Sequence, residues 1–122
     1  LRSSIQEKYA RDTFAKQGAQ LVSYGKAPES FMDLKAGRVD AAFVDAAVGD
    51  TDFIKTPNGK GFALVGPDYN EAKYFGVGSG IAVRKGDKAL LARINGALKQ
   101  IRADGSYDKI QKKYFSFDIY GK

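Results

Sequence analysis

The sequence has 122 residues, the size of about one domain, of which 43% are hydrophobic and 28% charged. This balance favours a folded domain, because no apolar run approaches the ~18–20 residues that a membrane span requires. The chain contains no Cys and no His, which excludes disulfides, thiol and imidazole catalysis and the commonest metal ligand. The function classes that remain are a binding protein and an enzyme that works with carboxylates and lysines.

The charge surplus lies in the second half of the chain. The whole sequence has 20 basic and 14 acidic residues, which gives a net charge of +6. Residues 1–61 carry an excess of one positive charge, and residues 62–122 an excess of five. A basic protein can bind nucleic acid or anionic membrane, so the spacing of these charges must decide what they mean.

The first predicted element is a helix over residues 5–17. It begins with a capping box, in which the Ser4 hydroxyl accepts from the N–H of Glu7 and the Glu7 carboxylate reaches back to the N–H of Ser4. Gly18 ends the helical pattern. Residues 20–24 then predict a short strand.

The next segments predict a βαβ unit. A helix over residues 28–36 starts at a proline and ends at Gly37. Residues 39–44 are continuously apolar, apart from Asp40, which favours a parallel strand buried on both faces. Residues 45–54 are compatible with a helix or an irregular segment.

The remaining elements are two strands and two helices. The strands are expected at residues 62–65 and 81–84, and the glycine-rich run Gly76–Gly80 precedes the second. That run lacks the register of a dinucleotide loop and is followed by a strand, so a flexible connection is favoured. Helices are expected over residues 88–103 and 106–115.

The two C-terminal helices separate apolar from basic residues. The basic residues avoid the apolar stripes, as on a solvated helix face, and are not interleaved with exposed aromatics as in a nucleic-acid groove. Contact with a protein partner stays open as an alternative. The stripes comprise Leu90, Leu91, Ile94, Leu98 and Ile101 in the first helix, and Tyr107, Ile110 and Tyr114 in the second.

Four aspartates are candidates for metal ligands or acid–base groups: Asp40, Asp45, Asp50 and Asp52. Only residues 50–52 approach the ligand spacing of a hard-cation loop, so Asp50 and Asp52 are expected to be surface carboxylates. Asp45 differs because it follows the predicted buried strand, and parallel sheets bind ligands beyond the carboxyl ends of their strands.

The start of the first helix is expected at the same rim of the sheet as Asp45. Helix N-termini attract carboxylates, so residues Ser4–Gln6 would hold a ligand carboxylate. Asp45 would hold an ammonium group. The combination predicts a site for a zwitterion such as an amino acid.

Several motifs occur in the order found in one protein family. The chain resembles the periplasmic amino-acid-binding proteins of ABC importers, most closely their lysine/arginine/ornithine- and histidine-binding branch. The resemblance covers essentially all 122 residues but only the second half of such a protein. The motifs are Ser4–Glu7, Asp33–Asp45, Tyr74–Gly80, Arg102–Ile110, Lys113–Phe115 and Phe117–Gly121.

The resemblance implies an α/β fold, a periplasmic binding protein type II-like lobe with a mainly parallel sheet. Residues 1–68 would form the ligand-binding lobe without its first strand, and residues 69–78 the hinge crossover. Residues 79–122 would supply a strand and two helices that complete the other lobe. The chain starts without a signal peptide, as if entered partway through a domain.

The resemblance also assigns site residues. Ser4, Ile5 and Gln6 correspond to the loop and helix start that hold the ligand α-carboxylate, and Asp45 to the acid that holds the α-ammonium group. Leu1 corresponds to a wall of the site. Ile5 departs from the family's usual Thr, so a side-chain hydroxyl contact is lost while its backbone N–H remains.

The expected function is capture of lysine, arginine, ornithine, histidine or an opine-like ligand in the periplasm and delivery to an ABC permease. No catalytic residue, metal, cofactor or nucleic acid is implied. The groups that select the side chain belong to the other half, so the partner is a missing first lobe, or a second copy through the C-terminal helices. The alternative is an amino-acid-sensing domain of a signalling receptor. A dehydratase on this fold would need a placed general acid, and none is evident.

Overall fold

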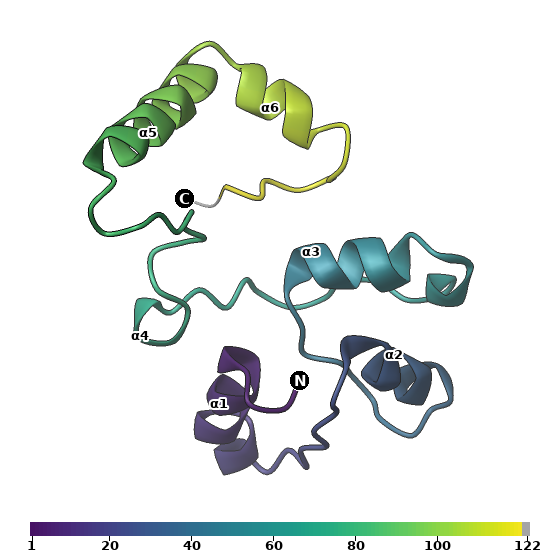
Figure 1. Ribbon diagram of the computed structural model, residues 1–122. Coiled ribbons are helices and arrows are strands. Elements are labelled where there is room, and N and C mark those ends of the chain that lie inside the picture. Colours follow the sequence, from purple (N-terminus) through teal and green to yellow (C-terminus); the bar gives the residue numbers. More distant parts are fainter. Residues whose placement is uncertain (121–122) are drawn as a thin grey trace. The chain divides into compact units, whose positions relative to one another are not determined.

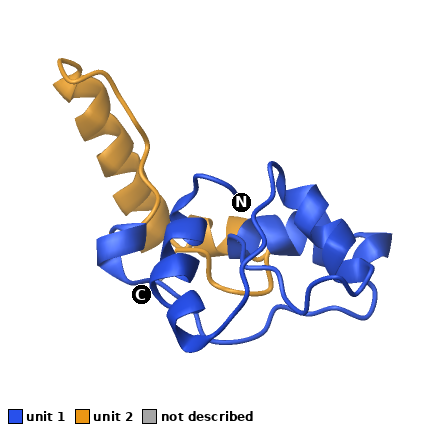
Figure 2. Ribbon diagram, turned by 90° about the horizontal axis from the view of Figure 1, so that it is seen from below, with its two compact units in different colours: residues 1–76 blue, residues 77–122 orange. Residues whose placement is uncertain are grey.

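A computed structural model describes residues 1–120, which form helices joined by irregular segments (Figure 1). The chain divides into two compact units, Leu1–Gly76 and a second that begins at Val77 (Figure 2). This boundary lies inside segment 69–78, the predicted hinge crossover. No helix within the described part of the chain is long and apolar enough to cross a membrane.

Helix α1 (Ile5–Asp12) begins as predicted but ends early. The Ser4 hydroxyl accepts from the N–H of Glu7 at 3.1 Å. The helix stops at Thr13, whose hydroxyl and N–H both donate to the carbonyl of Tyr9 and so close its last turn. A separate 3₁₀ turn, η1 (Ala15–Gln17), carries the chain to Gly18, where φ is +96°.

The helices that follow in unit 1 are short. Helix α2 (Ala27–Lys35) agrees with the predicted helix within one residue. Segment 45–54, which the sequence allows to be a helix or irregular, is helical from residue 46 and comprises α3 (Ala46–Gly49) and a π-helical turn, η2 (Asp50–Ile54). A 3₁₀ turn, η3 (Pro57–Gly59), and helix α4 (Ala72–Phe75) complete unit 1.

The predicted strands are wrong for this structure. Residues 1–120 contain no β-strand, and the segments 20–24, 39–44, 62–65 and 81–84 are irregular. An apolar run can favour an extended chain, but a strand forms only when a neighbour completes its hydrogen-bond ladder. No such ladder joins these segments in the described chain, so the predicted βαβ unit and mainly parallel sheet are not observed.

Two clusters of aromatic rings form the core of unit 1. In the first, named the Tyr9 cluster, Tyr9 is 4% exposed and packs against five other rings at centroid distances between 5.0 and 5.7 Å. In the second, named the Phe53 cluster, the rings of Phe31 and Phe53 stack at 4.8 Å and Phe62 joins them. The Tyr9 cluster comprises Tyr9, Phe14, Phe43, Tyr69, Tyr74 and Phe75.

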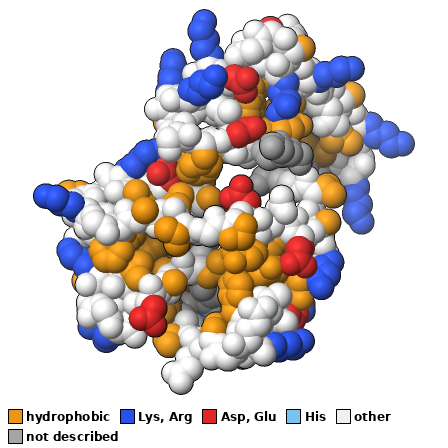
Figure 3. All heavy atoms as spheres, turned by 180° about the vertical axis from the view of Figure 1, so that it is seen from behind, with side chains coloured by type: hydrophobic (Ala, Val, Ile, Leu, Met, Phe, Trp, Pro, Cys, Tyr) orange, Lys and Arg blue, Asp and Glu red, His pale blue; other side chains and the backbone are white. Residues whose placement is uncertain are grey.

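Residues 77–120 of unit 2 contain two helices. Helix α5 (Lys88–Ala103) has the predicted bounds, and the Asp87 carboxylate accepts from the N–H of Leu90 at its start. Helix α6 (Ser106–Gln111) is shorter than the predicted 106–115, because the next residues form tighter turns. None of the 16 residues of α5 is buried, and Figure 3 shows hydrophobic side chains at the surface of the molecule.

Candidate functional site

The start of α1 offers unpaired backbone donors. The Ser4 hydroxyl accepts from the N–H of Glu7 and donates to the carbonyl of Leu1 at 2.6 Å. Within residues 1–120, the N–H groups of Ile5 and Gln6 donate to no protein acceptor. Free donors in the first turn are common to all α-helices, and they favour binding of an anion. The predicted carboxylate-binding residues are therefore chemically suited to that task.

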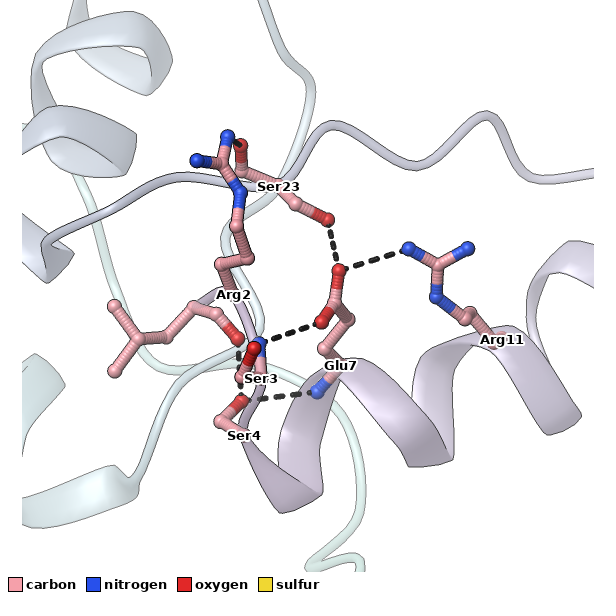
Figure 4. A network of polar contacts seen from close by, with 7 residues as sticks. Arg2, Ser3, Ser4, Glu7, Arg11 and Ser23 are labelled. Atoms are coloured by element: carbon pink, nitrogen blue, oxygen red, sulfur yellow. Dashed lines mark hydrogen bonds and ion pairs between the residues drawn. The ribbon is translucent and has the colours of Figure 1, made fainter.

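The loop Leu1–Ser4, which leads into α1, is tied to the segment after η1 (Figure 4). The N–H of Arg2 donates to the carbonyl of Tyr24 at 2.8 Å, and the Arg2 guanidinium donates to the carbonyl of Ser23 at 3.1 Å. Ser3 has a φ of +59°, which is uncommon for any residue other than glycine. The loop thus has a defined and unusual backbone conformation.

Glu7 connects this loop to the rest of unit 1 (Figure 4). Its carboxylate accepts from the N–H of Ser3 at 2.7 Å, the hydroxyl of Ser23 at 2.5 Å and the guanidinium of Arg11 at 2.9 Å. These donors, led by the Ser23 hydroxyl, lower the pKa of Glu7 to about 2. The carboxylate is therefore ionised at neutral pH.

The observed Glu7 contact corrects the predicted capping box and reveals a residue that the sequence analysis did not place in the site. The carboxylate was expected to accept from the N–H of Ser4, but it accepts from that of Ser3. The S-x-x-E spacing indicates a role for Glu7 at the helix start. It carries no signal for the contact with Ser23, which lies 16 residues away in the sequence.

Asp45 caps helix α3. Its Oδ1 atom accepts from the N–H groups of Ala47 at 2.9 Å and Val48 at 3.3 Å. Its Oδ2 atom has no protein partner among the described residues, and the side chain is exposed. One carboxylate oxygen is thus fixed by the helix, and the other is available to a ligand.

The two ends of the predicted site, segment 1–6 and Asp45, are not bonded to each other. No hydrogen bond or ion pair in residues 1–120 links Asp45 to segment 1–6. Leu1 and Ile5, the predicted apolar members, are both exposed. The chain alone therefore presents donors and an acceptor without enclosing them.

The other aspartates have structural or surface positions. Asp50 was expected at the surface but is 5% exposed and pairs with the ammonium group of Lys55 at 2.5 Å, so that prediction is wrong. Burial of Asp50 follows from the π-helical turn, which places it next to buried Gly49 and Phe53. Asp52 and Asp40 are exposed. The described residues contain no cluster of three or more Asp and Glu side chains that could hold a metal ion.

Residues 6–117 match the family described as bacterial extracellular solute-binding proteins, family 3. The chain belongs to this family. The match covers both compact units and confirms the resemblance drawn from the sequence motifs. The predicted association with binding proteins, rather than with enzymes, is confirmed with it.

Three relatives show which members of the family are similar to this chain. The L-arginine-binding protein of Pseudomonas aeruginosa is 49% identical over 99% of the chain and 47% of its own length. The lysine/arginine/ornithine-binding periplasmic protein of Escherichia coli K12 is 45% identical over 99% of the chain and 46% of its length. The histidine-binding periplasmic protein of the same strain is 42% identical, with the same coverage.

The chain spans about half the length of these relatives. Two of the three are named periplasmic proteins, and all three are named for the basic amino acids that they bind. These names agree with the predicted branch of the family.

Proposed function

We propose that this chain supplies one side of a binding site for a basic amino acid in an ABC import system of the periplasm. The observation that carries the proposal is its similarity, over 99% of its length, to proteins named for binding arginine, lysine, ornithine and histidine. The ligand would lie between two lobes, and the closed form would be recognised by a membrane permease. No covalent chemistry is involved.

The start of α1 would hold the ligand carboxylate. The free N–H groups of Ile5 and Gln6, together with the hydroxyl of Ser4, support this role because they lie at the positive end of a helix. Ile5 contributes through its backbone alone, since its side chain carries no donor. Leu1 would form part of the wall beside the carboxylate.

Asp45 would hold the ligand ammonium group. Its Oδ2 atom supports this role, because the cap of α3 uses only Oδ1 and leaves the second oxygen available. The helix N–H donors also fix the orientation of the carboxylate before the ligand arrives. A preorganised acceptor loses less conformational freedom on binding.

The rest of the site would come from a first lobe outside this chain. The ends of the proposed site have no direct contact and no cover in residues 1–120, which supports the need for a second lobe. Closure would occur about residues 69–78, where Gly76 and Gly78 have φ values of +70° and +128°. Residues 79–122 would then pack on that lobe.

The experiment that tests this function joins the chain to the part of the P. aeruginosa L-arginine-binding protein that it does not match. Thermal shift with arginine, lysine, ornithine and histidine, followed by isothermal titration, measures binding by this chimaera. We expect at least one basic amino acid to raise the melting temperature, because a ligand that binds only the folded state stabilises it. Absence of any shift with all four ligands would contradict the proposal.

Asp45→Asn in the chimaera tests the ammonium contact. The substitution keeps the shape and a cap acceptor but removes the counter-charge, so affinity should fall by several kcal/mol. Asp52→Asn is the matched control, because Asp52 is an exposed aspartate of the same helical segment outside the proposed site. A loss below about tenfold for Asp45→Asn, or an equal loss for the control, would remove Asp45 from the site.

A further inference from the structure

The carboxylate of Glu7 joins three parts of unit 1. Its donors come from the loop before α1 (Ser3), from the segment after η1 (Ser23) and from the next turn of α1 itself (Arg11). The Glu7 side chain is 14% exposed. In an ordinary capping box the carboxylate would stay within the helix start. Here it reaches one residue further back and holds the loop.

The loop needs such a contact because of the conformation of Ser3. A non-glycine residue at a φ of +59° occupies a sparsely populated backbone region, and it stays there only when its surroundings determine it. The bond from the Ser3 N–H to Glu7 is one such determinant. The bond from the Arg2 N–H to the carbonyl of Tyr24 holds the residue before Ser3. The bond from the Ser4 hydroxyl to the carbonyl of Leu1 closes the turn that contains Ser3.

We propose that Glu7 is a positioning residue of the amino-acid site, which fixes the backbone of Leu1–Ser4 and thereby aims the first turn of α1 at the ligand carboxylate. This inference rests on the proposed function. Without the Glu7 carboxylate, Ser3 relaxes toward common backbone conformations. Leu1 and Ser4 then move with it, because the turn that they close includes Ser3.

Glu7 acts through the loop and does not contact the ligand. Its two oxygens are already engaged by three donors, two of them neutral and one the Arg11 guanidinium. A free carboxylate facing a ligand carboxylate would repel it. The Arg11 guanidinium offsets this charge, and the bonds from Ser3 and Ser23 hold the carboxylate against the loop.

Three substitutions of Glu7 separate the effect of its side-chain length from the effect of its charge. Glu7→Ala removes the carboxylate, and Glu7→Asp keeps the charge in the first turn but is too short to reach Ser3 and Ser23. Glu7→Gln keeps the length of the side chain and its bonds to the loop, because its amide oxygen accepts from the Ser3 N–H and its amide N–H donates to the Ser23 hydroxyl, while the bond from the Arg11 guanidinium is lost. Glu29→Ala is the matched control. Glu29 accepts from the N–H groups of Gly25 and Lys26 at the start of α2, outside the proposed site.

Two measurements follow the variants. Amide hydrogen exchange of Ser3 in the 122-residue chain reports the loop directly, and isothermal titration of arginine into the chimaera reports the site. We expect faster Ser3 exchange and a Kd raised by about tenfold or more in Glu7→Ala and Glu7→Asp. Glu7→Gln should bind within about threefold of the unsubstituted chimaera, and Glu29→Ala should leave both quantities unchanged.

Several outcomes would overturn the proposal. Unchanged Ser3 exchange in Glu7→Asp would show that Glu7 does not fix the loop, and this variant decides the matter if Glu7→Ala fails to fold. Released Ser3 with unchanged arginine affinity would show that the loop does not position the site. If the unsubstituted chimaera binds none of the basic amino acids, the proposed function and the ligand role of Glu7 fail together. Ser3 exchange still tells whether Glu7 holds the loop, so the two failures are distinguishable.

Discussion

The two compact units reach their structure in opposite ways. Unit 1 has helices of at most nine residues, yet it buries the side chains of Tyr9, Phe31 and Phe53. Unit 2 has a 16-residue helix, yet Gln111 alone is buried among residues 77–120. Unit 1 is held by contacts between segments up to 62 positions apart in the sequence, and unit 2 by contacts between segments much nearer in the sequence, such as the Arg102 guanidinium over the Tyr120 ring.

This difference shows that a regular helix does not imply a core. Helix α5 is rich in Ala, Leu, Lys and Arg, which have high helix propensity, and it carries an aspartate cap. These local features account for its bounds without tertiary packing. In unit 1 the Tyr9 hydroxyl donates to Glu71 and the Tyr74 hydroxyl to Asp12, each across 62 positions of the sequence.

Tyr9→Ala tests the core of unit 1 and has the largest expected effect. The truncation removes a ring that contacts five others, and such losses in a core cost about 3–5 kcal/mol. Urea unfolding of the 122-residue chain measures the change in the free energy of unfolding. Ile81→Ala in unit 2 is the control, and we expect it to cost less than about 1 kcal/mol because Ile81 is 60% exposed and lies outside the apolar stripe of α5.

Equal losses for the two substitutions would contradict the contrast between the units. Tyr9→Phe refines the test, since it keeps the ring and removes only the hydroxyl bond to Glu71. We expect a loss of about 1 kcal/mol for this variant, the usual net value of one hydrogen bond.

The exposed apolar stripe of α5 predicts that another protein surface packs against unit 2. Leu91 and Leu98 are 43% and 36% exposed, and fully burying a leucine side chain is worth roughly 1.5–3 kcal/mol. We expect the chain to associate through this face, with a second copy or with a first lobe. Sedimentation should show association of the chain, and the pair Leu91→Glu and Leu98→Glu should abolish it.

Val22→Glu is the control for the stripe, because Val22 is an exposed apolar residue of unit 1. It should leave association unchanged. A monomeric chain before any substitution, with and without a first lobe supplied separately, would contradict the prediction. Loss of association in the control would place the contact on unit 1.

Structure that depends on neighbouring residues could be predicted from the sequence. Capping, turn and periodicity signals predicted the start of α1, the bounds of α2 within one residue and the full extent of α5. The same signals carry no information about long-range pairing. The predicted strands, such as residues 39–44, needed partners that local pattern cannot supply.

The candidate site shows the same difference between local features, which could be predicted, and long-range contacts, which could not. Ser4 is predicted from a local capping signal, and the structure makes it the cap of α1. Asp45 is predicted from the end of a strand that does not form, and the structure makes it the cap of α3. Glu7 was placed at the helix start, but its bond to Ser23 depends on the fold of the intervening chain. The burial of Asp50 depends likewise on a π-helical turn that the pattern did not predict.

Ser4→Ala compares the two units at their helix caps. Loss of a side-chain cap costs about 1 kcal/mol, and Ser4 caps α1 as Asp87 caps α5. We expect Ser4→Ala and Asp87→Ala to lower stability by similar amounts in thermal unfolding. Ser4→Ala alone should also weaken arginine binding by the chimaera, and equal affinities for the two variants would make Ser4 only a cap.

Acid should loosen unit 1 before unit 2. Hydrogen-bond donors hold the pKa of Glu7 at about 2 and lower the pKa values of Asp12 and Asp33, all in unit 1. In unit 2 the hydroxyl and N–H of Ser106 lower the carboxyl pKa of Asp104. Glu7 joins three segments of unit 1, whereas the partner of Asp104 is two residues away, so ionisation of Glu7 is more closely linked to folding.

The sign of this effect follows from proton binding. A carboxyl with a pKa of 4.5 in the unfolded chain and about 2 in the folded one stabilises the fold fully above pH 4.5. That stabilisation is lost as the pH falls from 4.5 to about 2, because the unfolded state binds the proton more readily. We expect the protection of the amides near Ser3 and Ser23 from hydrogen exchange, measured relative to the intrinsic exchange rate at each pH, to fall across this interval. In Glu7→Gln that loss of protection should be weaker, since no proton is taken up at position 7, whereas Asp104→Asn should leave it intact. An unchanged pH profile in Glu7→Gln would show that the Glu7 network does not couple the folding of unit 1 to acid.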